Sequence, residues 1–500
     1  MTGKVFLVGA GPGDAGLITV KGRDILTQAE VVVYDSLVGE GIFNLIPEHV
    51  EMIDAGKHAK CHTMEQEAIN QLLVEKALEG KCVVRLKGGD PFLFGRGGEE
   101  LELLAERGIS FEVVPGVTSA FAVPCYNGIP VTHREFASSV HVFTGHRKHG
   151  EPLQLDYEVL ARLSGTLVFL MGVSNLGEIC GGLLAAGMEP QTPAAVLQQG
   201  TCAGQRKIIS NLANLPSEAQ KQEIQTPAIF VVGEVCALGN QFGWYEKLPL
   251  FGKKVLVTRP KERSKMLADR LRRLGAEVLE VPTIRLERIE DNRRLWKEFE
   301  RLPNYQYLVF TSPTGVEVFF EELKEKGRDI RSVGGARIAA IGAGTAKSLK
   351  ERGLICELMP EIYDGCHLGI LLGETCRDGD RILIPRAAQG NPQLIEEIER
   401  RVEAEITEIP IYRTEYGSPF QMSGIQKQFE QGLIHMAVFT SASTVRGFAR
   451  AAEGLDFGLV QAVCIGAQTE AAAQELGMKT VTAKAATINS LVDTCMSVGR

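Results

Sequence analysis

The chain has 500 residues, of which 44% are apolar and 23% charged, and its net charge is −8. This composition is ordinary for a folded protein and excludes disorder, collagen and a coiled coil as the main state. The length predicts about three or four domains. Residues 1–250 carry −9 and residues 251–500 carry +1, so neither half has the basic excess expected of a nucleic-acid-binding protein.

The eleven cysteines are scattered and form no C-x-x-C pair, so neither a zinc site nor a disulfide framework is predicted. The pattern favours reduced thiols and a cytoplasmic protein. No apolar stretch approaches 18 residues, and the N-terminal segment lacks the apolar core of a signal peptide, so we expect no membrane association. The histidines between 133 and 149 are spaced across a predicted strand, and we expect no metal site.

The first half of the chain alternates β-branched runs with helical patterns such as Glu65–Leu78, which favours α/β architecture with a parallel sheet. After Pro115 a second set of strands follows, and it predicts a second α/β lobe. The predicted strands are Lys4–Ala10, Val31–Tyr34, Cys82–Leu86, Phe111–Val114, Val140–Thr144, Thr166–Met171, Ala194–Leu197 and Ala228–Gly233.

Residues 241–252 are the predicted linker, and their aromatic side chains indicate that the linker packs down. Beyond it, three segments recur in the same order at nearly constant offset. They are 253–260 with 380–387, 307–320 with 436–449, and 336–353 with 461–477. This repeat predicts two similar α/β lobes with a cleft between them, a common place for a small-molecule site.

Glycine-rich turns end two strands of the first half. Gly9-Ala-Gly11-Pro-Gly13-Asp14 resembles a dinucleotide turn, but Pro12 lacks a backbone donor and Asp14 stands where glycine or alanine is needed. The second turn, Gly88-Gly89-Asp90-Pro91, allows a ligand to approach the backbone closely. Asp90 is placed to accept hydrogen bonds from a ribose or a cationic ligand, although a purely structural turn has the same pattern.

In the second half, small hydroxyl side chains follow equivalent strands and turns of the repeat. Hydroxyls and free amides at helix starts are natural receptors for carboxylates, and helix capping alone is the alternative. A polyanionic ligand is therefore predicted for the cleft. The candidate residues are Thr311, Ser312, Thr345, Thr440, Ser441 and Thr469.

The motifs VGAGPGD, RLKGGDPFLFGRGGEE, PGVTSAFAV, GIPVTHR, VFTGH and TPAIFVVGEV, in this order, resemble uroporphyrinogen-III C-methyltransferases of the tetrapyrrole methylase fold. The resemblance covers residues 1–240, with lobes of about 1–116 and 117–240. It implies that S-adenosylmethionine methylates uroporphyrinogen III at C2 and C7 to give precorrin-2, towards sirohaem or cobalamin. Asp35 and Lys57 align with the family's proton acceptor and proton donor.

The same resemblance implies which residues line the S-adenosylmethionine pocket. They are Pro12, Gly88, Gly89, Asp90, Leu93, Thr118, Ser119, Met171 and Gly200. It also implies a homodimer formed through the methyltransferase half. Because this acidic half must bind an octacarboxylate, a local basic patch is expected. On charge alone its candidates are Lys57, Arg85, Lys87, Arg96, Arg134 and Arg147.

Residues 253–500 resemble uroporphyrinogen-III synthases through VLVTRP, IGAGT, IPIYRTE, IGAQT and two FTS segments. The resemblance implies two lobes joined by crossing strands, one of about 253–287 plus 414–500 and one of about 288–412. Tyr412 matches the family's cleft tyrosine, which assists loss of hydroxide from hydroxymethylbilane. Ring D is then inverted on cyclisation, and the hydroxyl residues of the cleft hold the carboxylates.

The sequence therefore predicts a bifunctional enzyme without a metal, a nucleic-acid partner or a membrane partner. Three alternatives stay open. One is a methyltransferase with a catalytically silent C-terminal ligand-binding or docking module. The others are a methylase of a later corrin precursor and a bilobed transport-type binding protein.

Overall fold

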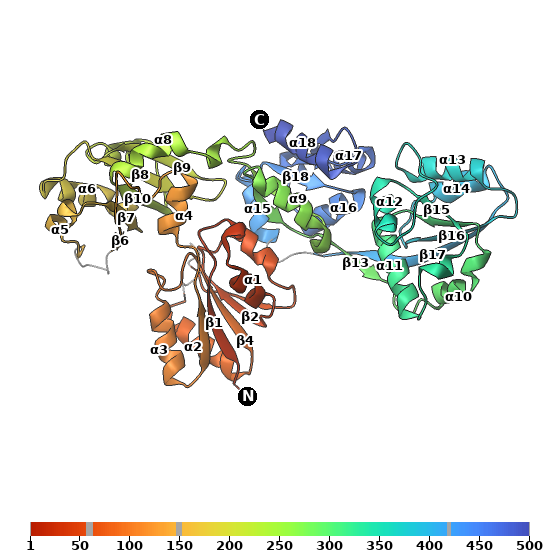
Figure 1. The fold of residues 1–500 in the computed structure, drawn as a ribbon, viewed down its shortest axis with the longest axis horizontal. Coiled ribbons are helices and arrows are strands. Elements are labelled where there is room, and N and C mark those ends of the chain that lie inside the picture. The colour runs from red at the N-terminus through yellow and green to blue at the C-terminus, as the bar shows by residue number, and fades with distance from the viewer. Residues whose placement is uncertain (1, 57–63, 147–152, 418–421, 500) are drawn as a thin grey trace.

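The computed structural model describes residues 2–56, 64–146, 153–417 and 422–499 (Figure 1). Within these residues the strands form four five-stranded sheets, two in each half of the chain. Helices follow most of the strands in all four sheets, so the predicted α/β class is confirmed.

The first sheet has the order β3-β2-β4-β1-β5, and all of its pairs are parallel. Its three inner strands, β2, β4 and β1, contain most of the valines and are largely buried, as expected of a parallel sheet covered by helices. The strands are β1 (Lys4–Gly9), β2 (Val31–Tyr34), β3 (Glu51–Asp54), β4 (Cys82–Lys87) and β5 (Ser110–Val114). The helices are α1 (Val20–Leu26), α2 (Gln66–Leu78) and α3 (Gly97–Glu106), with the short 3₁₀ helices η1 (Ala15–Leu17) and η2 (Glu40–Leu45).

The second sheet, β6-β7-β10-β8-β9, is mixed. Only β6 and β7 are parallel, because β8 returns directly into β9 as an antiparallel pair and β10 runs against both of its neighbours. Its strands are β6 (Val140–Thr144), β7 (Thr166–Leu170), β8 (Pro193–Gln198), β9 (Arg206–Asn211) and β10 (Ala228–Val232). Its helices are α4 (Ser119–Tyr126), α5 (Tyr157–Arg162), α6 (Leu176–Ala185) and α7 (Leu215–Lys221), with the 3₁₀ helix η3 (Val173–Asn175).

The predicted linker packs against both halves. It contains α8 (Gly239–Phe242) and η5 (Tyr245–Lys247), after the 3₁₀ helix η4 (Glu234–Leu238). The ring of Tyr245 lies 4.8 Å from that of Tyr126 and 5.4 Å from that of Phe251, and Leu250 is completely buried. The linker is therefore part of the folded core and not a free tether.

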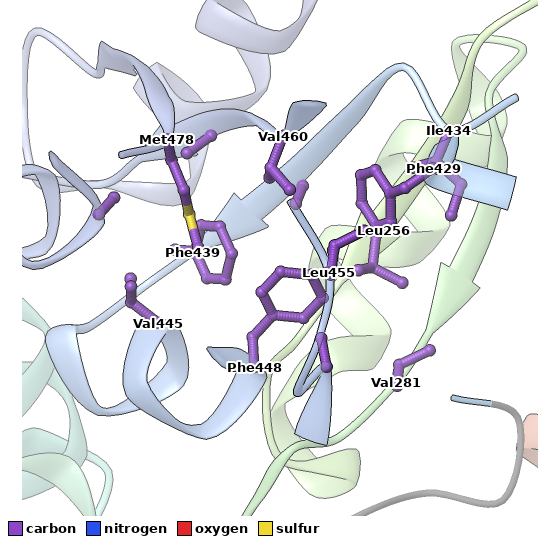
Figure 2. Close-up of a cluster of buried hydrophobic side chains, with 14 of the residues drawn as sticks. Leu256, Val281, Phe429, Ile434, Phe439, Val445, Phe448, Leu455, Val460 and Met478 are labelled. Atoms are coloured by element: carbon purple, nitrogen blue, oxygen red, sulfur yellow. The ribbon is translucent and has the colours of Figure 1, made fainter. Parts of the chain in front are cut away.

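The third sheet, β12-β11-β18-β19-β20, is parallel throughout. Leu256, Phe439 and Phe448 lie at the centre of one of its two apolar layers (Figure 2). Its strands are β11 (Lys254–Val257), β12 (Glu277–Glu280), β18 (Met436–Phe439), β19 (Gln461–Cys464) and β20 (Lys479–Thr482). Its helices are α9 (Lys261–Arg273), α15 (Met422–Glu430), α16 (Ala442–Ala451), α17 (Ala467–Gln474) and α18 (Ile488–Gly499), with η8 (Phe457–Leu459).

The fourth sheet, β13-β17-β16-β14-β15, is parallel except for β13, which runs against β17. Its strands are β13 (Ile284–Arg288), β14 (Tyr307–Phe310), β15 (Arg337–Ala340), β16 (Arg381–Ala387) and β17 (Glu405–Tyr416). Its helices are α10 (Arg293–Arg301), α11 (Pro313–Glu325), α12 (Ala343–Lys350), α13 (Gly365–Thr375) and α14 (Gln393–Glu399), with η6 (Leu302–Asn304) and η7 (Ile330–Val333).

Strands β13 and β17 join the third and fourth sheets, and they run side by side between the two lobes (Figure 1). The predicted lobe limits at 287/288 and 412/414 fall inside these two strands. Because of this crossing, each lobe contains strands from both copies of the sequence repeat. Strand β11, from the first repeat, pairs with β18 from the second, whereas β16, from the second repeat, pairs with β14 from the first.

Candidate functional sites

The first candidate site lies where the carboxyl ends of β1, β4 and β5 meet. The backbones of Gly11 and Gly89 exchange hydrogen bonds of 3.2 and 2.8 Å. A Cβ on Gly116 would lie 2.0 Å from the carbonyl oxygen of Gly89, and one on Gly9 would lie 2.4 Å from the Cα of Gly116. The three loops can approach this closely only because Gly9, Gly89 and Gly116 carry no side chain at the points of contact.

Asp90 holds this junction together. One of its carboxylate oxygens accepts from the backbone N–H groups of Phe92 and Leu93, at 2.9 and 3.2 Å, and the other accepts from Gly116 at 2.9 Å. The sequence predicts that Asp90 contacts a ligand. The structure shows that both of its oxygens also shape the loop.

A loop between β8 and β9, residues 199–205, closes the junction from the second sheet. The N–H of Asp14 donates to Oγ1 of Thr201 at 3.1 Å, and a Cβ on Gly200 would lie 2.4 Å from the side chain of Val123 in α4. Leu93 packs into the apolar cluster that also contains Val123 and Leu170. Leu170 is the last residue of β7, and Met171, which follows it, is 47% exposed.

The nine predicted S-adenosylmethionine residues therefore come from elements that converge at one junction between the two sheets. Three turns of the first sheet supply Pro12, Gly88–Asp90 with Leu93, and Thr118 with Ser119; the second sheet supplies Met171 and Gly200. Thr118 caps α4 by accepting from the N–H of Ala120 at 3.3 Å. Bare glycine backbone at this junction leaves room for a flat ligand such as a nucleoside.

Asp35 follows β2 and lies beside this junction. Its carboxylate accepts from the N–H of Gly88 at 3.3 Å and from that of Leu37 at 3.1 Å, and it lies 3.8 Å from the guanidinium of Arg85. About a quarter of the side chain is exposed, so a substrate can reach it. Lys57, the predicted proton donor, lies outside the described residues.

Beneath Asp35 lies a buried charge cluster that the sequence analysis did not find. The fully buried carboxylate of Glu100 accepts from Nε of Arg85 at 3.1 Å and from Nζ of Lys87 at 2.7 Å. Burial, and then the neighbouring Arg85, lower the pKa of Lys87. Glu100 and Leu104 are both completely buried and lie one helical turn apart on α3. Their spacing in the sequence was the available signal that Glu100 lies on the apolar face of this helix.

This cluster corrects one prediction. Arg85 and Lys87 were candidates for an open basic patch, but they are 3% and 4% exposed and bound to Glu100. They are therefore wrong as surface ligands for an octacarboxylate. Arg96 and Arg134 are exposed. Lys57 and Arg147 lie outside the described residues.

The second candidate site lies in the C-terminal half. The hydroxyl of Tyr412, in β17, lies 2.9 Å from the hydroxyl of Ser312 at the end of β14. Ser312 also caps α11 by accepting from the N–H of Gly315 at 2.9 Å. The crossing strand therefore brings together two predicted site residues that are 100 positions apart.

The remaining predicted hydroxyls of this half divide by exposure. Thr311, Thr440 and Ser441 are partly exposed, and Ser441 caps α16 in a reciprocal arrangement with Thr444. Thr345 and Thr469 are only 2% and 3% exposed, on the inner faces of α12 and α17. For all of these hydroxyl residues, the role of carboxylate ligand stays a prediction.

In the described part of the chain, no group of three histidine, cysteine, aspartate or glutamate side chains is arranged to hold a metal ion. None of the described helices combines the length and apolar character needed to cross a membrane.

The fold and sites define a protein with a methylase-like half followed by a two-lobed half. The family model of tetrapyrrole (corrin/porphyrin) methylases matches residues 4–216, and that of uroporphyrinogen-III synthase HemD matches residues 265–493. The chain is 46% identical to the porphyrin biosynthesis protein HemD of Ruminiclostridium josui over 99% of this chain and 98% of that protein. It therefore belongs to the family of fused tetrapyrrole methylases and uroporphyrinogen-III synthases.

Two further proteins resemble the chain in part. A uroporphyrinogen-III C-methyltransferase of Bacillus subtilis is 42% identical over 72% of this chain and 74% of its own length. The crystal structure of uroporphyrin-III C-methyl transferase from Thermus thermophilus, complexed with S-adenyl homocysteine, is 39% identical. It covers 47% of this chain and all of its own, with a TM-score of 0.42.

Proposed function

We propose that the chain is a bifunctional enzyme of tetrapyrrole biosynthesis. Its C-terminal half cyclises hydroxymethylbilane to uroporphyrinogen III with inversion of ring D. Its N-terminal half methylates uroporphyrinogen III at C2 and C7 with S-adenosylmethionine, giving precorrin-2. Full-length similarity to the HemD protein and the two family matches, one on each half, support both activities.

The observation that carries the methyltransferase assignment is the convergence of the glycine turns with residues 199–205 beside Asp35. Bound there, S-adenosylmethionine supplies an activated methyl group on its sulfonium. Gly88, Gly89 and Gly200 leave room for it, and Met171 covers it from the second sheet. Alignment of the pyrrole carbon with the methyl group provides much of the rate acceleration.

Asp35 is the proposed general base. The methylated carbon already carries a carboxylate side chain and has no hydrogen, so Asp35 removes the proton that the ring system must lose elsewhere after methyl transfer. The backbone N–H groups of Gly88 and Leu37 and the guanidinium of Arg85 orient its carboxylate. Lys57 is the proposed proton donor. Two S-adenosylmethionine molecules are consumed for each precorrin-2.

In the C-terminal half, Tyr412 is the proposed acid that donates a hydrogen bond to the departing hydroxide of hydroxymethylbilane. Its hydroxyl touches Ser312 at the start of α11, where free backbone amides favour negative charge. The carboxylates of the substrate are held by Thr311, Ser312, Thr345, Thr440, Ser441 and Thr469.

We also propose that the protein is a cytoplasmic homodimer that associates through its methyltransferase half. Large apolar side chains are exposed there and could contribute to such an interface. They include Phe92, Phe121 and Phe136, which are 60%, 46% and 43% exposed. Sedimentation of the full chain tests this prediction. The proposed domains are the methyltransferase half at residues 1–240 and the synthase half at residues 253–500, joined by the linker at 241–252.

Product analysis from hydroxymethylbilane, with and without S-adenosylmethionine, tests both activities. We expect uroporphyrinogen III alone without S-adenosylmethionine and precorrin-2 with it. Spontaneous cyclisation gives the type I isomer. The opposite outcome has two parts: hydroxymethylbilane gives the type I isomer, and methylation occurs only when uroporphyrinogen III is supplied. This outcome would show that the C-terminal half is a catalytically silent module.

A further inference from the structure

A partly buried ionic cluster joins the edge of the third sheet to the methyltransferase half. Glu277, the first residue of β12, accepts from the backbone N–H of Ala203 at 2.8 Å through one carboxylate oxygen. Its other oxygen lies 2.9 Å from Nζ of Lys254 in β11. The two side chains are only 21% and 15% exposed, so solvent screens the pair weakly.

Ala203 belongs to the loop 199–205, which carries Gly200 of the proposed S-adenosylmethionine pocket. Gln199 and Thr201 in this loop adopt positive φ angles of 45° and 74°. Such backbone persists in residues other than glycine only where surrounding contacts enforce it. Within the methyltransferase half, the N–H of Thr201 donates to Gln205 at 2.9 Å. The Ala203–Glu277 bond adds a constraint from the other half.

The same lysine reaches a second element of the methyltransferase site. Nζ of Lys254 lies 3.5 Å from Glu40, which begins η2 five residues after Asp35, and η2 packs against β12. Gln428 bonds both Lys254 and Glu40, at 3.0 and 2.8 Å. Burial alone would lower the pKa of Lys254, but the carboxylates of Glu277 and Glu40 outweigh it and raise that pKa. Lys254 is therefore a cation shared by both halves.

We propose that Glu277, held by Lys254, is a positioning residue for the methyltransferase reaction, and that the synthase half thereby helps to hold the loop 199–205 in place. This inference rests on the proposed function. It implies that the synthase half has a structural role in methylation besides its own chemistry. The connection is one charge-assisted hydrogen bond to a strained loop, so its loss affects ligand binding more than the chemical step.

The experiment compares full-length wild type with Glu277→Ala and Glu277→Gln by calorimetric titration with S-adenosylhomocysteine. A charge-assisted hydrogen bond corresponds to about tenfold in affinity, so we expect Glu277→Ala to bind about tenfold more weakly. The KM for S-adenosylmethionine should rise to match, with kcat within about twofold. Glu277→Gln should recover most of the affinity, because its amide oxygen still accepts from Ala203.

Arg285→Ala is the matched control, since Arg285 pairs with Glu48 across the same interface at an exposed position. It should bind S-adenosylhomocysteine as wild type does. Synthase turnover and the unfolding midpoint of each variant report correct folding. Wild-type affinity in Glu277→Ala, or equal weakening in Arg285→Ala, would overturn the inference. Failure of wild type itself to bind S-adenosylhomocysteine would instead overturn the proposed methyltransferase function.

If Glu277→Ala does not fold, Lys254→Met provides the second variant. It leaves the Ala203 hydrogen bond in place but removes the cation that fixes Glu277. We expect faster amide hydrogen exchange confined to residues 199–205 and weaker S-adenosylhomocysteine binding. Unchanged exchange together with unchanged binding would contradict the proposal.

Discussion

The hydroxyl groups of Tyr412 and Ser312 lie 2.9 Å apart, although one belongs to a crossing strand and the other begins a helix of the fourth sheet. Ser312 also caps α11 by accepting from the N–H of Gly315, so its replacement should affect helix stability, whereas the proposed role of Tyr412 is in catalysis. The two residues can therefore be separated by experiment.

Tyr412→Phe should lower the synthase kcat at least about tenfold, because it removes the proposed proton donor to the leaving hydroxide. Ser312→Ala should lower the unfolding free energy by about 1 kcal/mol through loss of the cap. Isomer analysis of the product and thermal unfolding measure the two effects. Methyltransferase activity is the internal control. An unchanged synthase rate in Tyr412→Phe would remove this residue from the mechanism.

Asp35→Asn should reduce methylation by about 10²- to 10⁴-fold, the usual contribution of a general base. The asparagine oxygen can still accept from Gly88, so S-adenosylhomocysteine binding should stay close to wild type. Single-turnover methylation and calorimetry separate the two quantities. Asp24→Asn, at an exposed carboxylate on α1, is the control. Equal loss of binding and rate would indicate a structural role for Asp35.

Gly116→Ala should abolish tight S-adenosylhomocysteine binding and destabilise the protein by about 2 kcal/mol, because its Cβ would overlap the carbonyl oxygen of Gly89. Gly98→Ala is the matched control. A Cβ at this exposed helical position meets no atom within 4 Å, and the change should stabilise the protein by about 0.5–1 kcal/mol. Denaturant unfolding and calorimetry measure both outcomes, and normal binding by Gly116→Ala would refute the close-approach argument.

Glu112 gives a prediction for acid stability. Hydrogen bonds from Lys21 and Lys4 lower the pKa of its carboxyl to about 2. The stabilisation is therefore complete above the ordinary pKa of 4.5 and is lost as the pH falls from about 4.5 to about 2. Glu112→Gln should be slightly less stable at pH 7 and converge with wild type at the acid end. The effect should shrink in high salt, because the group is exposed.

Glu100→Gln tests the buried charge cluster. It leaves Arg85 and Lys87 buried without their carboxylate, so we expect a loss of about 3–5 kcal/mol in unfolding free energy. Adding Lys87→Met should restore part of that loss by removing one uncompensated charge. Urea unfolding of the single and double variants gives both values. A double variant less stable than Glu100→Gln would show that Lys87 stabilises the fold by itself.

The predicted strands lie close to the observed ones wherever the apolar run was continuous. Val31–Tyr34 and Val140–Thr144 coincide with β2 and β6, and Cys82–Leu86 is one residue short of β4. In the first half of the chain, two of the described strands were not predicted. In β3 (Glu51–Asp54) and β9 (Arg206–Asn211) charged and polar residues at the sheet edge interrupt the pattern. Edge strands need fewer apolar side chains, so the sequence signal is weaker there.

The α/β class, the repeat and the glycine turns could be predicted from the sequence, because side-chain period and backbone freedom are local properties. The sheet in which each strand of the repeat lies could not, since it follows from the crossing of β13 and β17. The burial of Arg85 and Lys87 against Glu100, and the hydrogen bond from Ala203 to Glu277 in the other half, likewise appear only in the folded chain. A charge in a sequence does not reveal its partner, because pairing depends on packing between segments that are distant along the chain.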